Sequence, residues 1–264
     1  MDKFNQVIEY VKTTCWQDDT ETAVVIKQAH KVFDEITLNK TKAKILYRIC
    51  GQTGSGKTSQ ILSTFEKISA EKNINPVILG VRTCAEYHPK YEYFKANFPS
   101  GELREKTNGF ALKCMSYVLK LLIEHGFMVI LDMTLLDPAY EEFVLNLSKN
   151  NDYKINYQIL AVNDNISTRF IEKRFKATGR IIYKSSADYF NQILLDGLKY
   201  IAEFDKTNSC YVWNAFDKIP VYVGPVCKCF NSFREAKNEI KDFIYSEEEL
   251  RSAKYEILKD KLEF

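Results

Sequence analysis

Residues 45–62 read ILYRICGQTGSGKTSQIL, and this stretch decides the fold. Its first six residues are largely apolar and partly β-branched, which predicts a strand over 45–50. The next eight satisfy the pattern GxxxxGK[ST], and apolar residues at 61, 62, 65 and 68 then recur at helical spacing. A strand, a glycine-rich loop and a helix in this order are the context of a phosphate-binding loop, or P-loop. The sequence therefore predicts a nucleoside-triphosphate site.

The predicted loop offers main-chain and side-chain contacts to the triphosphate. Its glycines let successive N–H groups point at phosphate oxygens, and the following helix adds the positive end of its dipole. We expect Lys57 to bridge the β- and γ-phosphates and the Thr58 hydroxyl to bind Mg²⁺. The predicted nucleotide-binding residues are Gly51, Gln52, Thr53, Gly54, Ser55, Gly56, Lys57, Thr58 and Ser59. The motif does not distinguish ATP from GTP.

The composition is that of an ordinary globular protein, with 264 residues, 45% hydrophobic and 27% charged. A net charge of +2 gives no strong basic field, so neither nucleic acid nor a membrane is an expected partner. The seven cysteines are odd in number and scattered, which suits a reducing cytosol. Cys227 and Cys229 lack two further ligands nearby for a zinc site, so Mg²⁺ is the one metal expected. The N-terminal segment lacks an apolar core of signal-peptide length, so we expect a cytoplasmic protein.

Apolar runs of strand length alternate with helical stripes along the chain. Strands are predicted at 45–50, 77–81, 127–132, 157–162, 210–214 and 221–224, and helices at 4–11, 25–36, 61–68, 112–122 and from Pro138. Alternation predicts an α/β P-loop NTPase fold, a three-layer sandwich with a mostly parallel sheet and helices on both faces. Asp18 and Glu21 are expected to form a capping box before the second helix. One domain is predicted over 1–264, with N-terminal helices in 1–40, a core at 45–225 and a helical tail at 231–264.

Motifs downstream of the P-loop decide between kinases and other nucleotide-binding classes. His88 and Pro89 follow the second predicted strand, and the run FMVILDMT at 127–134 ends in an acid and a threonine. Arg174 and Arg180 come later. This order resembles the zeta toxin family, and the resemblance covers roughly residues 45–225.

The resemblance implies a kinase that transfers the γ-phosphate of ATP or GTP to a sugar hydroxyl, which in known toxins belongs to UDP-N-acetylglucosamine. It assigns Lys57 and Thr58 to the phosphates and Mg²⁺, and Arg174 and Arg180 to a triphosphate clamp. Asp132 matches an acidic residue, usually Glu, that faces the acceptor. The other interpretation of Asp132 is a ligand that acts on Mg²⁺ through water. Family context also suggests an antitoxin protein as partner.

One position departs from the family pattern. Arg82 stands where the family has its catalytic aspartate, and Gly80 occupies the other acidic position. A guanidinium is effectively always protonated and cannot accept the proton of the acceptor hydroxyl. Either Glu86 or Asp132 takes the role of general base, or the activity has changed.

Other interpretations stay open. The charged stretch at 172–176 also fits a solvated helix face, and His88 fits a hydrogen-bond donor that fixes its loop better than a catalytic base. The acceptor is another nucleotide sugar, a nucleoside or a small metabolite if the changed base position reflects a changed substrate. A nucleotide-binding module without transferase activity is a second function, and a nucleotide-switched regulator whose terminal helices dock a protein partner is a third.

Overall fold

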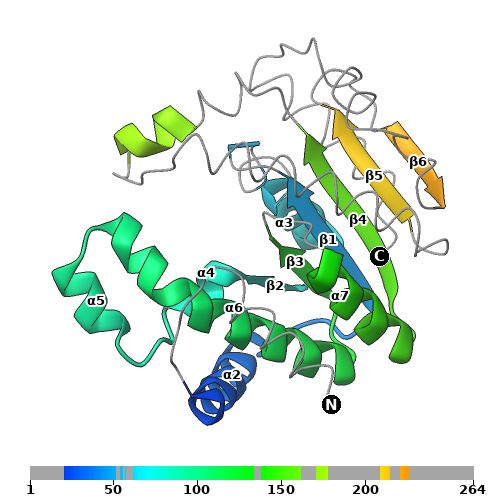
Figure 1. The fold of residues 1–264 in the computed structure, drawn as a ribbon. Helices are drawn as coiled ribbons and strands as arrows, with labels where there is room; N and C mark the ends of the chain where they lie inside the picture. The colour runs from blue at the N-terminus through cyan, green and yellow to red at the C-terminus, as the bar shows by residue number, and fades with distance from the viewer. Residues whose placement is uncertain are drawn as a thin grey trace.

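A six-stranded sheet forms the centre of the structure, a computed structural model that describes residues 21–51, 54, 55, 57, 62–133, 138–161, 171–177, 209–214 and 221–225. The strand order is β2-β3-β1-β4-β5-β6, and all neighbours are parallel except β5 and β6. The strands are β1 (Ile45–Gly51), β2 (Val77–Gly80), β3 (Val129–Asp132), β4 (Lys154–Ala161), β5 (Ser209–Asn214) and β6 (Val221–Pro225). The mostly parallel sheet is confirmed (Figure 1).

Helices follow most of the strands in the described part of the chain. They are α2 (Thr22–Ile36), α3 (Ser63–Glu71), α4 (Val81–Ala85), α5 (Tyr91–Asn97), α6 (Ser100–Glu124) and α7 (Pro138–Asn150). A further short helix covers residues 171–177. None of the helices in the described ranges is long and apolar enough to cross a membrane.

Two adjacent residues of β1 show that helices cover both faces of the sheet. The ring of Tyr47 lies 4.8 Å from that of Phe65 on α3, whereas Arg48 forms an ion pair with Glu141 on α7. Successive side chains of a strand point to opposite faces, so α3 and α7 lie on opposite sides. The three-layer sandwich is therefore confirmed.

The larger hydrophobic core lies on the α7 side. It joins every second residue of the inner strands to buried side chains of α6, which is 25 residues long. On the outside of α6 packs α2, through the fully buried Val25, Ala29 and Val32. The predicted helix over 25–36 is thus confirmed, while those at 4–11 and in 231–264 lie outside the described residues.

Several predicted boundaries were wrong. Glu21 is the N-cap of α2 with extended backbone angles and no side-chain cap, so it cannot be the inner member of a capping box; Asp18 lies outside the described residues. The second strand stops at Gly80 because α4 begins at once, and Phe127 forms only an isolated antiparallel bridge with Lys42 before β3. Helix α7 does start at Pro138, where the fixed ring angle suits the first turn.

Candidate active site

Three parallel strands end side by side where the strand order reverses. Asp132 closes β3, and its register partners are Ile49 of β1 and Gly80 of β2. A β-carbon at Gly80 would lie 3.1 Å from the Asp132 carbonyl oxygen, so the glycine permits the close approach of β2. Because β1 lies between β3 and β4, the carboxyl ends of β1 and β3 border a topological switch point. Ligands of open α/β sheets bind in such places.

In the described part of the predicted P-loop, two glycines adopt positive φ angles. Gly51 and Gly54 have φ angles of 143° and 77°, values that other residues rarely adopt. Lys57 Nζ donates a hydrogen bond to the Gly51 carbonyl oxygen at 2.7 Å and so lies back along the loop. The predicted residues Gln52, Thr53, Gly56, Thr58 and Ser59 lie outside the described residues.

The donor set of this loop fits a triphosphate with Mg²⁺. Ser55 is 4% exposed, and its Oγ has no hydrogen-bond partner among the described residues, so a phosphate oxygen would satisfy it. Lys57 supplies a cation beside it, and Asp132 supplies the hard oxygen ligands that Mg²⁺ prefers.

Lys57 lies in a cluster of charged groups from several segments. Burial lowers the pKa of Lys57 to about 8; Asp132 and Cys50 oppose the shift, while Arg174 and Arg48 add to it. Each of these charges must be close enough to act on the ammonium group. The fold thus brings together the sequence-predicted Lys57, Asp132 and Arg174.

The charges of this cluster also act on the carboxyl group of Asp132. Burial raises the pKa of its carboxyl group, and the charges of Lys57, Arg48 and Arg174 limit the rise without cancelling it. A carboxylate with a raised pKa accepts a proton more readily than an exposed one.

Arg174 differs from its neighbours in the helix at 171–177. It is half-buried, while the flanking residues at 172, 173, 175 and 176 are exposed. Its charge acts on both Lys57 and Asp132. The solvated face predicted for this stretch therefore belongs to its neighbours, and Arg174 faces the site. Arg180, its predicted partner, lies outside the described residues.

Three residues were missed by the sequence analysis, and two of them form a pair. Arg48 and Glu141 form a fully buried ion pair, with Nη2 2.5 Å from Oε1 and Nε 3.1 Å from the same oxygen. Burial alone would lower the pKa of Arg48, but Cys50 and Glu141 more than compensate and raise it. An arginine inside an apolar strand was the available signal, because buried charges are almost always paired.

Arg104, on the second turn of α6, is the third missed residue. It is half-buried, and burial and the nearby charge of Arg174 lower its pKa. Only its residue type was available as a signal, since the sequence alone does not show that the charge of Arg174 acts on it.

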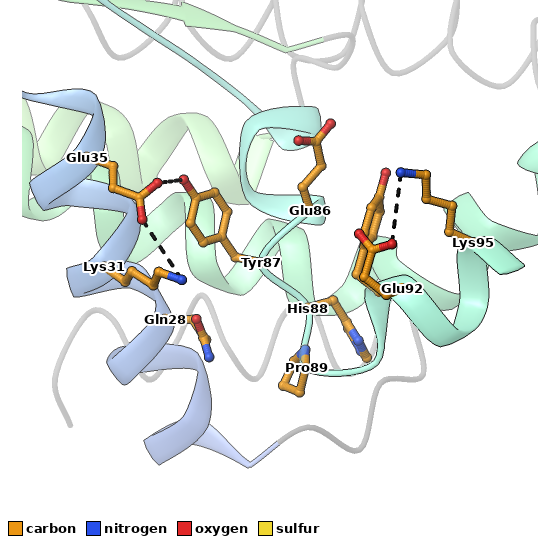
Figure 2. Close-up of a pocket in the computed structure, with 10 residues that line it drawn as sticks. Gln28, Lys31, Glu35, Glu86, Tyr87, His88, Pro89, Glu92 and Lys95 are labelled. Carbon is orange, nitrogen blue, oxygen red and sulfur yellow. Dashed lines mark hydrogen bonds and ion pairs between the residues drawn. The ribbon is translucent and has the colours of Figure 1, made fainter.

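Glu86 lies in a different environment from Asp132. It is exposed just after α4 and lines a hollow of about 520 Å³ between α2 and α5. Figure 2 shows this hollow, in which the Tyr87 hydroxyl lies 2.5 Å from a carboxylate oxygen of Glu35 and Lys31 approaches the same side chain. Glu86 is not among the charges that act on Lys57 or Asp132.

His88 holds the loop that follows α4. It is 8% exposed, its Nδ1 accepts a hydrogen bond from the Lys90 N–H at 3.0 Å, and its ring packs between Phe94 and Phe110. The predicted loop-fixing role fits this geometry, in which Nδ1 is an acceptor. Arg82 is exposed on α4.

A glycine-rich loop after the first parallel strand, with a lysine, an aspartate and an arginine gathered at the switch point, defines a P-loop protein of kinase-like architecture. The sequence model of the zeta toxin family matches residues 29–223. The chain belongs to this family.

Solved structures share the fold at low sequence identity. One is the "PezAT chromosomal toxin-antitoxin system of the human pathogen Streptococcus pneumoniae", with a TM-score of 0.66, 19% identity, and coverage of 92% of this chain and 97% of that chain. Another is the AvrRxo1-ORF1:-ORF2 complex, with a TM-score of 0.53, 11% identity, and coverage of 99% and 85%. Such likeness establishes the fold alone. No curated protein sequence matches the chain significantly.

Proposed function

We propose that this protein is a cytoplasmic, single-domain kinase that transfers the γ-phosphoryl group of ATP or GTP to a hydroxyl of a small acceptor. The observation that carries the proposal is the meeting of Lys57, Asp132 and Arg174 at the carboxyl edge of the sheet. Phosphoryl transfer depends on positioning and on charges aimed at the phosphate oxygens, and this cluster supplies both.

Each residue has a role that its environment supports. The loop N–H groups and Lys57 bind the β- and γ-phosphates, and Arg174, with Arg180, stabilises the charge that spreads over the transferred group. Thr58 would hold Mg²⁺, and a role of Asp132 as a Mg²⁺ ligand through water is the alternative to its role as general base. Bound Mg²⁺ would neutralise phosphate charge.

Asp132 is the general base that the geometry favours over Glu86. The acceptor oxygen forms a bond to the γ-phosphorus, the bond from that phosphorus to the bridging oxygen breaks, and the nucleoside diphosphate leaves. The hydroxyl proton passes to the Asp132 carboxylate, whose raised pKa makes it the better acceptor. Glu86 lies in the hollow between α2 and α5 and acts on neither Lys57 nor Asp132.

We propose a nucleotide sugar as the acceptor class, with UDP-N-acetylglucosamine as its first member to test. Family membership supports this class. The structural relative from a toxin–antitoxin system also supports an antitoxin protein as partner.

A nucleotide-binding protein without transferase activity is the second candidate function. Arg82 favours it, because this residue occupies the position of the family's catalytic aspartate and cannot accept a proton.

Transfer of label from γ-labelled ATP with Mg²⁺ to a panel of nucleotide sugars distinguishes the two functions. The kinase proposal predicts a labelled acceptor that disappears with Lys57→Ala and Asp132→Asn. ATP binding without any labelled acceptor, across nucleotide sugars, nucleosides and small metabolites, would favour the second function.

A further inference from the structure

The guanidinium of Arg48 reaches from its buried ion pair to a backbone atom beside the candidate site. Glu141 of α7 accepts hydrogen bonds from Nη2 and Nε, while Nη1 donates to the Ile49 carbonyl oxygen at 3.3 Å. The same oxygen accepts a second hydrogen bond, at 3.2 Å, from the N–H of Met133, which directly follows Asp132. A carbonyl oxygen has two lone pairs, and two donors can use both. One oxygen atom therefore joins Arg48 to the end of β3.

Arg48 and Asp132 lie on opposite faces of the sheet. The ring of Tyr47 points toward α3, and Ile49, two residues further along β1, shares that face. Asp132 is the register partner of Ile49, and register partners of parallel strands point to the same face, so its side chain lies on the α3 side. Arg48 is fully buried on the other side, paired with Glu141. Arg48 is therefore suited to hold the backbone beside Asp132 and not to touch a substrate.

The shared oxygen is also close to the P-loop along the chain. Ile49 lies two residues before Gly51, whose carbonyl oxygen accepts the hydrogen bond from Lys57 Nζ at 2.7 Å. Strand β1 leads into the loop and β3 ends at Asp132, so the two hydrogen bonds to the Ile49 oxygen link the loop to Asp132. Of the two donors, only that of Arg48 belongs to a side chain and can be removed by substitution.

We propose that Arg48 is a positioning residue that fixes Asp132 relative to the P-loop through the shared carbonyl oxygen of Ile49. The inference rests on the proposed kinase function and deepens it, because part of the transfer rate then depends on a residue that contacts neither nucleotide nor acceptor. A misplacement of about 1 Å can cost about 10²-fold in rate. Nucleotide affinity depends on the loop's own contacts with the phosphates, so it should change little.

The test compares the rate of transfer with ATP affinity in a variant that removes this link and leaves no buried charge unpaired. Arg48→Met with Glu141→Leu replaces the ion pair by apolar side chains and should fold. Transfer from γ-labelled ATP to the nucleotide sugar that wild-type protein labels best gives kcat, which is expected to fall about tenfold or more. The Kd for Mg²⁺–ATP should stay within about twofold of the wild-type value.

Single substitutions of the pair separate positioning from stability. Glu141→Gln keeps the Arg48 donor to the Ile49 oxygen, so it should be less stable than the double variant and yet faster. Arg48→Lys keeps a charge opposite Glu141, but one ammonium group cannot reproduce the fork of a guanidinium, so kcat should fall. It is the test variant if the double variant does not fold.

A further readout asks whether Arg48 acts through Asp132. In single turnovers, replacing the pair should cost little additional rate once Asp132→Asn has removed the carboxylate, so the two losses should not add. Val32→Ala is the matched control for stability, since Val32 is fully buried on α2, outside α6. It should lower stability and leave kcat unchanged.

Unchanged kcat in the folded double variant, or losses that add to that of Asp132→Asn, would overturn the inference while wild-type protein still transfers phosphate. A fall in kcat with Val32→Ala equal to that in the double variant would overturn it too, because stability alone would then explain the rate. Wild-type protein that labels no acceptor would instead refute the proposed function, and the inference with it.

Discussion

At the scale of single residues, the proposed site depends on charged side chains that the fold buries instead of leaving in water. Lys57 lies among two arginines and an aspartate, and burial holds its pKa near 8, far below the ordinary 10.5. A bound triphosphate would bring negative charge to the same place and favour the protonated lysine. Nucleotide binding and protonation of Lys57 are therefore linked.

This linkage predicts that ATP affinity falls as pH rises above about 8, the range in which Lys57 of the free protein loses its proton. Binding should then take up as much as about one proton, because the nucleotide raises the lysine pKa. Calorimetry in two buffers of different ionisation enthalpy measures the uptake.

Lys67→Met, on the exposed side of α3, is the control and should keep the uptake, whereas Lys57→Met should abolish it. Unchanged proton uptake in Lys57→Met would assign the linkage to another group.

The choice of general base gives a second prediction. Asp132→Asn should lower the transfer rate by about 10²–10⁴-fold and leave ATP binding intact, while Glu86→Gln should retain activity. The wild-type rate should rise as pH rises through the raised pKa of Asp132, since only the carboxylate accepts a proton. Transfer rates of the wild type and both variants, measured across the acidic pH range, check these expectations. Loss of transfer in Glu86→Gln but not in Asp132→Asn would make Glu86 the general base.

At the scale of helices and strands, the pair of Arg48 and Glu141 links α7 to β1, the strand that leads into the P-loop. The two residues are 93 positions apart in the sequence, and both are fully buried. Arg48 also donates a hydrogen bond to the Ile49 carbonyl oxygen at 3.3 Å. The pair therefore fixes the strand that carries the loop.

Glu141→Gln is expected to lower the free energy of unfolding by about 3–5 kcal/mol, because it leaves the Arg48 charge buried without its partner. Urea denaturation measures the change. Replacing both residues, as Arg48→Met with Glu141→Leu, should recover most of the loss.

Glu92→Gln serves as the control, because its ion pair with Lys95 spans 4.0 Å on the surface and should contribute little. Equal effects of Glu141→Gln and Glu92→Gln would contradict a structural role for the buried pair.

Elements with strong local signals were predictable from the sequence. The P-loop strand and the Pro138 helix start follow from neighbouring residues, and the alternation of strands and helices predicts the sandwich. The Glu141 partner of Arg48 was not predictable, since pairing across 93 residues depends on how α7 packs. The same holds for Arg104, on which the charge of Arg174 acts only in the folded chain. The capping box predicted from Asp18 and Glu21 was wrong, because a capping sequence does not fix the residue at which the helix begins.

At the scale of the whole molecule, the proposed site joins residues from β1, the loop after it, β3 and the helix at 171–177. A ligand that binds these segments together should stabilise the folded state by mass action. Mg²⁺ and ATP at about 100 times Kd are expected to add about 2.7 kcal/mol to the free energy of unfolding. Thermal unfolding measures this gain, which should shrink with a chelator and in Lys57→Ala; an unchanged gain in Lys57→Ala would mean binding elsewhere.

We propose that Lys57 and Arg174, far apart in the sequence, both act on one bound triphosphate. A double-mutant cycle tests it most directly, with Mg²⁺–ATP affinity measured for wild type, Lys57→Ala, Arg174→Met and the double variant. Shared phosphates and mutual electrostatic interaction predict that the double variant loses an amount of binding free energy different from the sum of the two single losses. Strict additivity, or an Arg174→Met variant that binds as wild type does, would contradict the account.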